Sequence, residues 1–376
     1  MDIKVRPVEE DSKLPNANAG NSSALREVDQ VVSKLVTAHV ASAKDREFMA
    51  DSEKSSIHSI KVLGEGAFGI VDLVVVDTIE GGLLCVRKKL LKQSKKNNND
   101  PEVEVQLMEA SAGCDFVLQL WSHVMGLYDV TLLLEYCPYG TLYNMLQVVS
   151  DLRSRSQVGC WNYISDSMLY LRRKAGLSED EARFYLACMV LGVESLHKRG
   201  LLHRDLKPDN CLIDEKRYVK VADLGLGKDL GVEGKRAYSK AGTPGYMAPE
   251  VFHSQGKATG GYTFSADVWS LGIILWQMVD GDLPKWSGNS WYWTKIHFPD
   301  TFSQNLRSLL LGLLDKAPML RISLEQVKVH PWFEGFDWDA LERQTMEAPR
   351  PKELEYVHIH VKLLPEHLKE QVLKRS

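Results

Sequence analysis

The sequence predicts an α+β fold of two lobes: a small antiparallel β-sheet lobe with one key helix, and a large, mainly helical lobe. Residues 58–135 are predicted to be mainly strands, because the apolar runs Val71–Val76 and Leu83–Val86 are separated by the turn-forming Glu80–Gly82. Beyond Gly140 the patterns are helical. A length of 376 residues accommodates two such lobes with terminal extensions.

Helix-capping signals delimit the first helix expected in the small lobe and a long helix in the large one. Asp100 suits an N-cap, Pro101 fits the first turn, and Gly113 suits the far end of the first helix. Ser178–Glu181 has the spacing of a capping box and opens a helix that is expected to continue to His197.

The segments outside these lobes differ in composition. Residues 1–22 are predicted to be a disordered tail, and the apolar spacing from Leu25 to Leu35 predicts a helical extension over 23–57. The polar, basic stretch at about 149–175 is predicted to be a surface insertion, with a docking or regulatory segment as the alternative. The two lobes are expected to form one domain over residues 58–335, with the small lobe at 58–135 and the large lobe at 136–335. A C-terminal tail is expected over 336–376.

Composition excludes several functional classes. A formal net charge of −4 gives no general attraction to nucleic acid or to an anionic membrane, so neither is expected as a partner. The six cysteines contain no CxxC pair, which argues against zinc and a disulfide framework and favours a reducing compartment. With no signal peptide after Met1, the expected location is intracellular, in the cytoplasm or else the nucleus.

A glycine-rich segment begins the series of chemical signals. Gly64, Gly66 and Gly69 allow the backbone to approach phosphate oxygens and to offer N–H donors. Dinucleotide-binding proteins share this pattern, but they need a helix after it. Here the strand Val71–Val76 follows, which argues against a dinucleotide oxidoreductase.

The next strand carries a candidate phosphate-binding cation. Alternation along a strand places Val86 and Lys88 on the same face. A lysine there can neutralise phosphate charge if an acid holds it. Glu104 on the following helix is the candidate acid, and Glu102 is the weaker one because it lies nearer the helix start.

The strongest signal is an ordered set of polar motifs in the second half of the chain. The set is His203–Asn210, Asp223–Gly225 and Gly242–Glu250. Phosphoryl transfer needs a carboxylate that orients the attacking hydroxyl, oxygen ligands for Mg²⁺, and a cation near the developing charge. Asp205, Asn210, Asp223 and Lys207 supply these residue types.

Together these segments resemble the signature set of the eukaryotic protein kinases, in the family's order, over roughly residues 58–335. The resemblance implies ATP and Mg²⁺ as cofactors and a protein as substrate. It assigns Asp205, Lys207 and Thr243 to catalysis, and Asn210 and Asp223 to the metal. It assigns nucleotide binding to Gly64, Gly66, Gly69, Val71, Val86, Lys88, Glu104, Glu135 and Cys137. Arg87 is the alternative to Lys88 by register, and the resemblance also pairs Glu250 with Arg321.

Two features resemble the serine/threonine branch: Lys207 two residues after Asp205, and Thr243 before Pro244. The segment from Phe336 is similar to the start of the tail of AGC kinases, such as the cyclic-AMP-dependent kinase. The chain departs from the family at Leu224, where an aromatic is common. No terminal aromatic motif follows the tail, which argues against control through a phosphorylated tail.

Regulation and specificity follow from the same resemblance. Ser239, four residues before Thr243, matches an activating phosphosite, so an upstream kinase or a regulatory subunit is a candidate partner. Thr141, Asp209 and Gln277 match three positions where AGC kinases carry carboxylates for substrate arginines. The competing function is a pseudokinase scaffold that binds nucleotide or partners without turnover. The presence of Lys88, Asp205 and Asp223 argues against it.

Overall fold

The structure is a computed structural model, and it describes residues 57–66, 69–78, 81–92, 100–156, 176–232, 235–284 and 297–349. The predicted disordered tail, nearly all of the N-terminal extension, the later part of the insertion and the end of the C-terminal tail lie outside these ranges. The chain divides into two compact units. The first holds the described residues up to Val105 and Gln119–Tyr136, and the second holds the rest.

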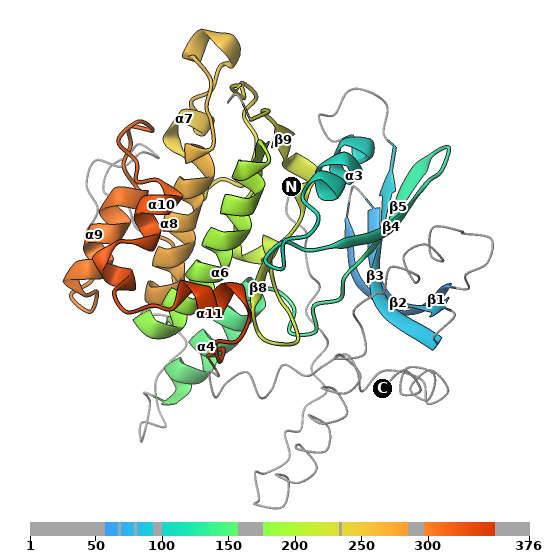
Figure 1. Cartoon of the computed structure of the whole chain (residues 1–376), viewed down its shortest axis with the longest axis horizontal. Helices are drawn as coiled ribbons and strands as arrows, with labels where there is room; N and C mark the ends of the chain where they lie inside the picture. Colours follow the sequence, from blue (N-terminus) through green and yellow to red (C-terminus); the bar gives the residue numbers. More distant parts are fainter. Residues whose placement is uncertain are drawn as a thin grey trace, which may run out of the picture. The chain divides into compact units, whose positions relative to one another are not determined.

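A five-stranded antiparallel sheet forms the first unit (Figure 1). Its strands lie in the order β1-β2-β3-β5-β4. Their bounds are β1 Ile57–Gly66, β2 Gly69–Thr78, β3 Gly81–Leu91, β4 Leu120–Met125 and β5 Asp129–Leu134. Gly81 and Gly82, which the sequence assigned to a turn, instead begin β3 and pair with Thr78 and Asp77, while Glu80 lies outside the described residues. Both predicted apolar runs lie inside strands.

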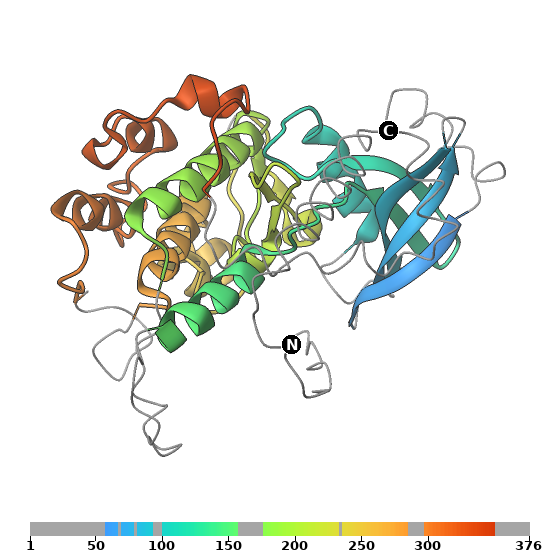
Figure 2. The same cartoon turned by 90° about the horizontal axis from the view of Figure 1, so that it is seen from below.

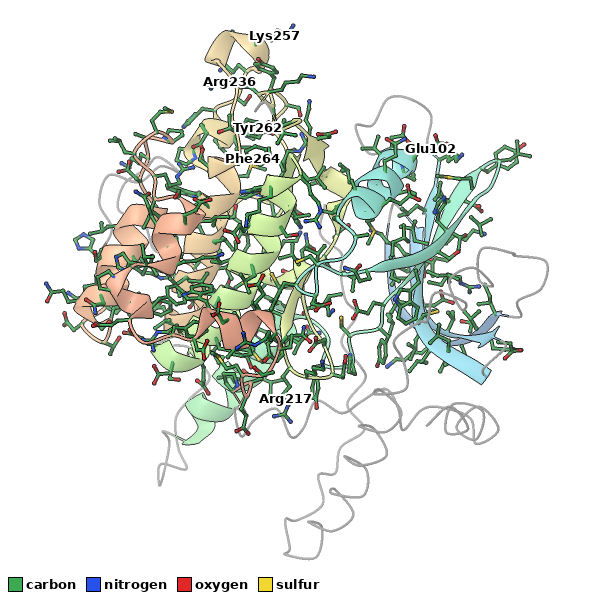
Figure 3. The ribbon with its side chains drawn as sticks, in the orientation of Figure 1. Glu102, Arg217, Arg236, Lys257, Tyr262 and Phe264 are labelled. Atoms are coloured by element: carbon green, nitrogen blue, oxygen red, sulfur yellow. The ribbon has the colours of Figure 1, made fainter. Side chains whose placement is uncertain are left out.

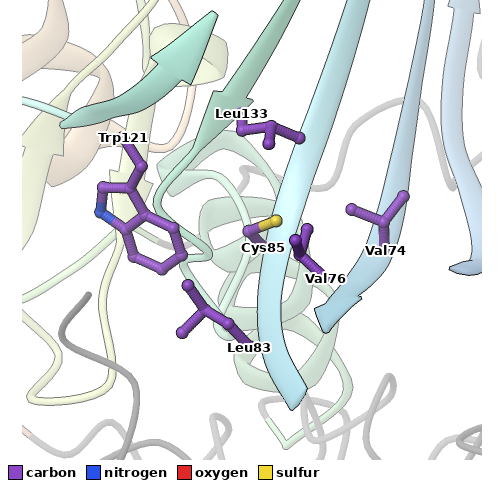
Figure 4. Packing of buried hydrophobic residues seen from close by; sticks show 6 residues of the cluster. All are labelled: Val74, Val76, Leu83, Cys85, Trp121 and Leu133. Carbon is purple, nitrogen blue, oxygen red and sulfur yellow. The ribbon is translucent and has the colours of Figure 1, made fainter. Parts of the chain in front are cut away.

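The sheet buries apolar side chains on both faces. Val74 lies opposite Cys85 and Val76 lies opposite Leu83, so these four side chains share one face, where Trp121 and Leu133 join them (Figure 4). The alternate residues Leu73, Val75 and Leu84 form a second buried cluster on the other face. Strands buried on both sides explain the nearly continuous apolar sequence of β2.

The helix α3, Pro101–Ala110, follows the predicted signals. Asp100 acts as its N-cap, because the Asp100 carboxylate accepts a 3.0 Å hydrogen bond from the backbone N–H of Glu102. Gly113, three residues beyond the helix, has a φ of +85°, a left-handed conformation that glycine adopts without steric cost. The capping signals therefore predicted both ends of this helix.

The second unit is mainly helical (Figure 1). Its helices are α4 Leu142–Ser156, α6 Glu179–Lys198, α7 Pro249–Phe252, α8 Ser265–Asp280, α9 Gln304–Leu313, α10 Leu324–Lys328 and α11 Trp338–Glu342. Four short 3₁₀ segments, η1 Pro208–Asn210, η2 Leu224–Leu226, η3 Gly256–Thr259 and η4 Pro331–Phe333, interrupt them. Short strands form two ribbons: β6 Leu201–Leu202 with β9 Lys228–Asp229, and β7 Cys211–Ile213 with β8 Val219–Val221. The helix α4 continues to Ser156, into the segment predicted as an insertion.

Two long helices, α6 and α8, lie side by side in the middle of this unit (Figures 1 and 2). The N-terminus of α6 carries the predicted capping box, in which Ser178 and Glu181 each accept a hydrogen bond from the other's backbone N–H. Helix α8 is buried along most of its length, and its Trp269 is fully buried. Asp267 is also buried in this helix although its carboxylate is charged. The carboxylate accepts several hydrogen bonds, which are described below.

An ion pair joins the start of α7 to the loop before α10. Glu250 accepts hydrogen bonds of 2.7 and 3.1 Å from the guanidinium of Arg321, which is buried. The same guanidinium donates to the carbonyls of Asp315 and Ser265. The pair expected from the family resemblance is therefore present. Its burial means that removal of one partner should cost about 3–5 kcal/mol.

Candidate active site

In the first unit, the glycine-rich segment ends β1 and begins β2. Gly66 lies opposite Gly69, and Gly64 lies opposite Val71. Gly69 has a φ of +150°, and a Cβ built on it would lie 1.7 Å from the carbonyl oxygen of Lys89. The close approach of β3 therefore requires glycine at this position, whatever ligand the segment binds. Residues 67 and 68, at the tip, lie outside the described residues.

The candidate nucleotide-binding side chains on β2 and β3 share one face of the sheet. Val71 lies opposite Lys88, and Val86 lies two residues before Lys88 on the same strand. The Lys88 ammonium lies 2.6 Å from the carboxylate of Glu104 on α3, and both side chains are largely buried. The ion pair that the sequence predicted is thus present, and it fixes the position of the ammonium beside two apolar side chains.

The two alternatives that the sequence left open have other partners. Arg87 lies on the opposite face, where its guanidinium makes bonds of 3.0 and 2.6 Å to the buried carboxylate of Asp72. Glu102 instead makes a 2.6 Å ion pair with Lys92. Neither residue is available for the roles of Lys88 and Glu104.

The segment predicted to bind adenine follows β5. Glu135 donates its backbone N–H to the carbonyl of Gln119 at 3.1 Å, and its carboxylate accepts from the Gln119 N–H at 3.3 Å. In the second unit, the buried Cys137 accepts a 3.2 Å hydrogen bond at its carbonyl from Gly140. Glu135 in the first unit and Cys137 in the second are therefore each held by hydrogen bonds within their own unit.

The catalytic candidates of the second unit form one hydrogen-bonded cluster. Thr243 donates its hydroxyl to Asp205 Oδ1 at 2.6 Å, and Lys207 Nζ donates to the same hydroxyl oxygen at 2.8 Å. Lys207 Nζ also lies 3.1 Å from Asp205 Oδ2. A carboxylate held by a hydroxyl and an ammonium has a fixed orientation, and it remains an acceptor for the proton of an incoming hydroxyl.

The two metal-ligand candidates come from adjacent segments. Asn210 ends η1, and its carbonyl accepts a 2.9 Å hydrogen bond from the N–H of Ala222, the residue before Asp223. The Asn210 side-chain nitrogen donates to the Asp205 carbonyl at 2.8 Å and to Asp205 Oδ2 at 3.1 Å. The Asn210 side-chain oxygen is therefore directed away from Asp205 and accepts no hydrogen bond from the described residues.

This donor set fits Mg²⁺. The ion prefers oxygen ligands and is usually held by one or two protein side chains together with substrate phosphates and water. Asn210 and Asp223 supply such oxygens, and Asp223 is solvent-exposed. Among the described residues no group of three or more His, Cys, Asp or Glu could hold a metal ion, so a protein-only cage of that kind is not found there. Asp223 has a φ of +65°, a strained conformation that Asp tolerates better than most residues.

Helix α8 fixes the backbone of the catalytic loop. The carboxylate of Asp267 accepts 2.9 Å hydrogen bonds from the N–H groups of His203 and Arg204 and from the His197 ring. Burial acts to raise the pKa of Asp267, but these bonds and the neighbouring imidazoles outweigh it and hold that pKa below its usual value. The family resemblance matches Asp267 to a central buried helix, but nothing in the sequence indicates His197 as its partner, 70 residues away.

The imidazole of His203 has a defined role in the same loop. Its Nδ1 accepts from the N–H of Asp205 at 3.2 Å, and its Nε2 lies 2.9 Å from the carbonyl of Ala222. These partners require the proton on Nε2, because a carbonyl can only accept. The fully buried ring thus connects the residue before Asp223 to Asp205, the candidate catalytic aspartate.

Ser239 lies beside the catalytic loop. Arg204 donates from its guanidinium to the Ser239 hydroxyl at 3.0 Å and to the Gly227 carbonyl at 3.1 Å. The predicted phosphosite therefore touches a cation that adjoins Asp205 in the chain. The family resemblance implies Lys228 as a second basic group within reach of a phosphate on Ser239, and Lys228 lies in β9.

Of the three positions matched to arginine-binding carboxylates, only one is acidic. The Gln277 side-chain oxygen is buried and accepts a 2.6 Å hydrogen bond from the Tyr246 hydroxyl. The Thr141 hydroxyl accepts from the N–H of Asn144 at the start of α4. Asp209 is exposed; partial burial raises its pKa, and the nearby Lys207 ammonium opposes the increase.

One unit thus carries a strand lysine held by a helix glutamate, and the other carries an aspartate surrounded by threonine, lysine and asparagine. These features are typical of protein kinase domains. Residues 57–333 match the family described as "Protein kinase domain", which is well over half of the chain. The chain therefore belongs to the protein kinase family, and the predicted two-lobed α+β fold is confirmed.

Curated relatives agree with this assignment. Human cGMP-dependent protein kinase 2 is 27% identical over 341 residues, which are 86% of this chain and 40% of that protein. Human ribosomal protein S6 kinase alpha-2 is 29% identical over 352 residues, 89% of this chain and 43% of that protein. Rat ribosomal protein S6 kinase alpha-1 is 30% identical over 328 residues, 84% of this chain and 40% of that protein.

These relatives are AGC serine/threonine kinases, which confirms the predicted AGC-like resemblance. The alignments cover only about two fifths of the relatives' length. Within the described residues, none of the helices has both the length and the apolar composition needed to span a bilayer.

Proposed function

We propose that this chain transfers the γ-phosphoryl group of Mg-ATP to serine or threonine hydroxyls of protein substrates. The observation that carries the proposal is the hydrogen-bonded cluster of Asp205, Thr243, Lys207 and Asn210. In this network Asp205 would supply the proton acceptor, Lys207 the cation, and Asn210 an oxygen for the metal. Phosphoryl transfer requires all three groups.

In this proposal Asp205 accepts the hydrogen bond of the target hydroxyl and takes its proton as the new O–P bond forms, while the bond from the γ-phosphorus to the bridging oxygen of ATP breaks and ADP leaves. Thr243 and Lys207 hold the carboxylate in that orientation, and the Lys207 ammonium offsets negative charge that develops on the transferring group. Asn210 and Asp223 would bind Mg²⁺, which supplies charge neutralisation on the phosphates. Lys88, held by Glu104, would contact the phosphates of ATP.

The competing function is a pseudokinase scaffold. Pseudokinases commonly lose the strand lysine, the catalytic aspartate or the metal aspartate, and this chain retains Lys88, Asp205 and Asp223. The Lys88–Glu104 ion pair and the ordered Asp205 cluster favour turnover over a purely structural role.

The test is phosphorylation of a degenerate peptide library by the purified chain, with Asp205→Asn as the matched variant. We expect Asp205→Asn to lose about 10²- to 10⁴-fold in turnover, the usual contribution of a general base, while ATP still binds. ATP affinity measured by calorimetry and the melting temperature serve as controls for folding. No phosphorylation by the wild-type chain, despite ATP binding, would favour the scaffold.

A further inference from the structure

Four exposed cations lie on two adjoining segments, residues 235–240 before Thr243 and the turn around Lys257. They are Lys235, Arg236, Lys240 and Lys257, and we call them the basic rim. Arg236 donates from its guanidinium to the carbonyls of Gly260 and Gly261, in the loop that follows Lys257 (Figure 3). The rim therefore brings together two segments of one unit.

The positive charge of the rim is not neutralised by the described residues. No ion pair joins any of its four members to a described carboxylate. Of the nearest described carboxylates in the chain, Glu250 is already paired with Arg321, and Asp229 accepts the N–H of Gly231 at 2.7 Å and forms no ion pair with the rim. Within the described residues the rim is therefore a cluster of like charges without an ion-pair partner, and such a cluster attracts an anionic group.

The backbone that carries Lys240 is fixed by neutral hydrogen bonds. Ala237 and Tyr262 exchange two backbone hydrogen bonds of 2.9 Å. The Tyr262 hydroxyl donates to the Ser239 carbonyl and the Ser254 hydroxyl donates to the Tyr238 carbonyl, each at 2.6 Å. The segment is thus ordered immediately before Lys240.

The side chain of Lys240 is also positioned. Its ammonium lies 3.5 Å from the centre of the Phe252 ring, a cation–π contact that orders the side chain without neutralising its charge. A lysine side chain that is already ordered loses less conformational entropy on binding a ligand than a freely rotating one. Lys240 is therefore the member of the rim best prepared to bind a ligand.

Lys240 lies between two contacts with the catalytic loop. Ser239 contacts Arg204 on one side, and Thr243 contacts Asp205 on the other. Thr243 is the third residue after Lys240, so their Cα atoms are at most about 10 Å apart. A peptide whose target hydroxyl lies at Asp205 therefore has residues, within about three positions of that hydroxyl, that can reach the segment carrying Lys240.

We propose that Lys240, supported by the rest of the basic rim, binds an aspartate or glutamate side chain within about three residues of the target hydroxyl in the substrate. This inference rests on the proposed function and names a substrate class for the same site: acidic sequences. A peptide is favoured over nucleic acid because the rim adjoins the residues proposed to act on a protein hydroxyl, and because the whole chain has a net charge of −4.

The test measures binding, so that it does not depend on turnover. Fluorescein-labelled peptides carry alanine at the target position and, within three residues of it, glutamate, glutamine or lysine. Fluorescence anisotropy with phosphatase-treated full chain gives the Kd of each. We expect the glutamate peptide to bind roughly 10-fold more tightly than the glutamine peptide, the usual scale for a hydrogen bond to a charged group.

Three variants make the assignment specific. Lys240→Met keeps the length and apolar stem of the side chain and should remove the preference for glutamate. Lys240→Glu should reverse it, so that the lysine peptide binds best. Lys316→Met removes an exposed lysine that has no ion pair among the described residues and lies after α9, and it should leave the preference intact.

Several outcomes would overturn the inference. Equal binding of the glutamate and glutamine peptides to the wild-type chain is one, and a glutamate preference that survives in both Lys240 variants is another. Loss of the preference in Lys316→Met would indicate a general charge effect. Lys240-dependent binding of polyuridylate that is tighter than binding of the glutamate peptide would indicate a nucleic-acid ligand. A protein that shows the preference but phosphorylates no peptide would refute the proposed function and support this inference.

Discussion

The hydroxyl of Thr243 donates a 2.6 Å hydrogen bond to the carboxylate of Asp205, although the two residues are 38 positions apart. The bond attaches the segment after Ser239 to the catalytic loop. Lys207 joins both groups, so the three side chains form a closed network. A change in any one of them is expected to alter the orientation of the carboxylate.

Removal of the Thr243 hydroxyl tests this network. Thr243→Val keeps the shape of the side chain but leaves the Asp205 and Lys207 contacts unmade. A hydrogen bond to a charged group contributes about 1.5–3 kcal/mol, so kcat should fall about 10- to 100-fold. Thr243→Ser retains the hydroxyl and should stay within a few-fold of the wild type. Steady-state kinetics on one peptide decide the matter, and similar losses in both variants would contradict the hydrogen-bond explanation.

The acid stability of the second unit should depend on Asp267. Hydrogen bonds outweigh burial and hold the pKa of Asp267 below its usual value, so its contribution to folding is complete above the unfolded pKa of about 3.9. That contribution is lost as the pH falls through the lower folded value. Urea unfolding between pH 3 and 7 should show wild-type stability declining at the acid end.

The matched variant is Asp267→Asn. It should lose about 3–5 kcal/mol at pH 7, because the partly buried His197 ring and two N–H groups lose a charged, fully buried acceptor. Its stability should also fall less steeply below about pH 4 than that of the wild type, since one titrating group is gone. Parallel curves for the two proteins would mean that Asp267 does not titrate on unfolding.

Asp223 and Leu224 should have separable effects. Asp223→Ala deletes a proposed oxygen ligand, so Mg²⁺-dependent nucleotide binding should be lost. Leu224→Phe restores the common aromatic and leaves the carboxylate in place, so turnover should remain near that of the wild type. Nucleotide titrations with and without Mg²⁺, together with kcat, distinguish the two. A dead Leu224→Phe protein beside an active Asp223→Ala protein would overturn the metal assignment.

Phosphorylation of Ser239 should raise specific activity. A phosphate adds about −1.5 to −2 charge at neutral pH, and Arg204 already lies 3.0 Å from the hydroxyl that would carry it. The competing interpretation is an activation segment that is ordered without phosphate, and the neutral bonds from Tyr262 and Ser254 support it. Specific activity is compared between phosphorylated wild type, confirmed by mass spectrometry, and Ser239→Ala. Equal activities would favour the second interpretation.

Local signals in the sequence predicted the parts of the fold that depend on neighbouring residues. Asp100 and Ser178 cap helices as expected, because capping is decided within four residues. Strand alternation likewise placed Val86 and Lys88 on one face. The contacts of His197 with Asp267 and of Tyr246 with Gln277 could not be predicted, because no spacing rule relates residues that only the tertiary fold brings together.

Substrate specificity is the last property that the site predicts. We expect this kinase to lack a strict requirement for arginine upstream of the target residue. Of the three positions that match arginine-binding carboxylates, Gln277 is engaged with Tyr246 and Thr141 caps α4. Neither can replace a carboxylate, because a bidentate pair with guanidinium depends on its charge. Each missing contact should forfeit about 1.5–3 kcal/mol of discrimination.

Asp209 keeps a carboxylate and is exposed, so a mild preference for one basic residue should remain. Although Asp209 is exposed, partial desolvation by its surroundings raises its pKa, so this preference should weaken as the pH falls toward that raised value, because the protonated acid carries no charge. An oriented peptide library read at pH 7.5, with Asp209→Asn as the matched variant, provides the measurement. The variant should lose the residual basic preference without gaining another.

Acids in the predicted insertion could replace the missing carboxylates, but that segment is net basic. Dominant selection of arginine at both the second and third upstream positions would contradict the prediction, since one exposed aspartate cannot bind two guanidinium groups in separate sites.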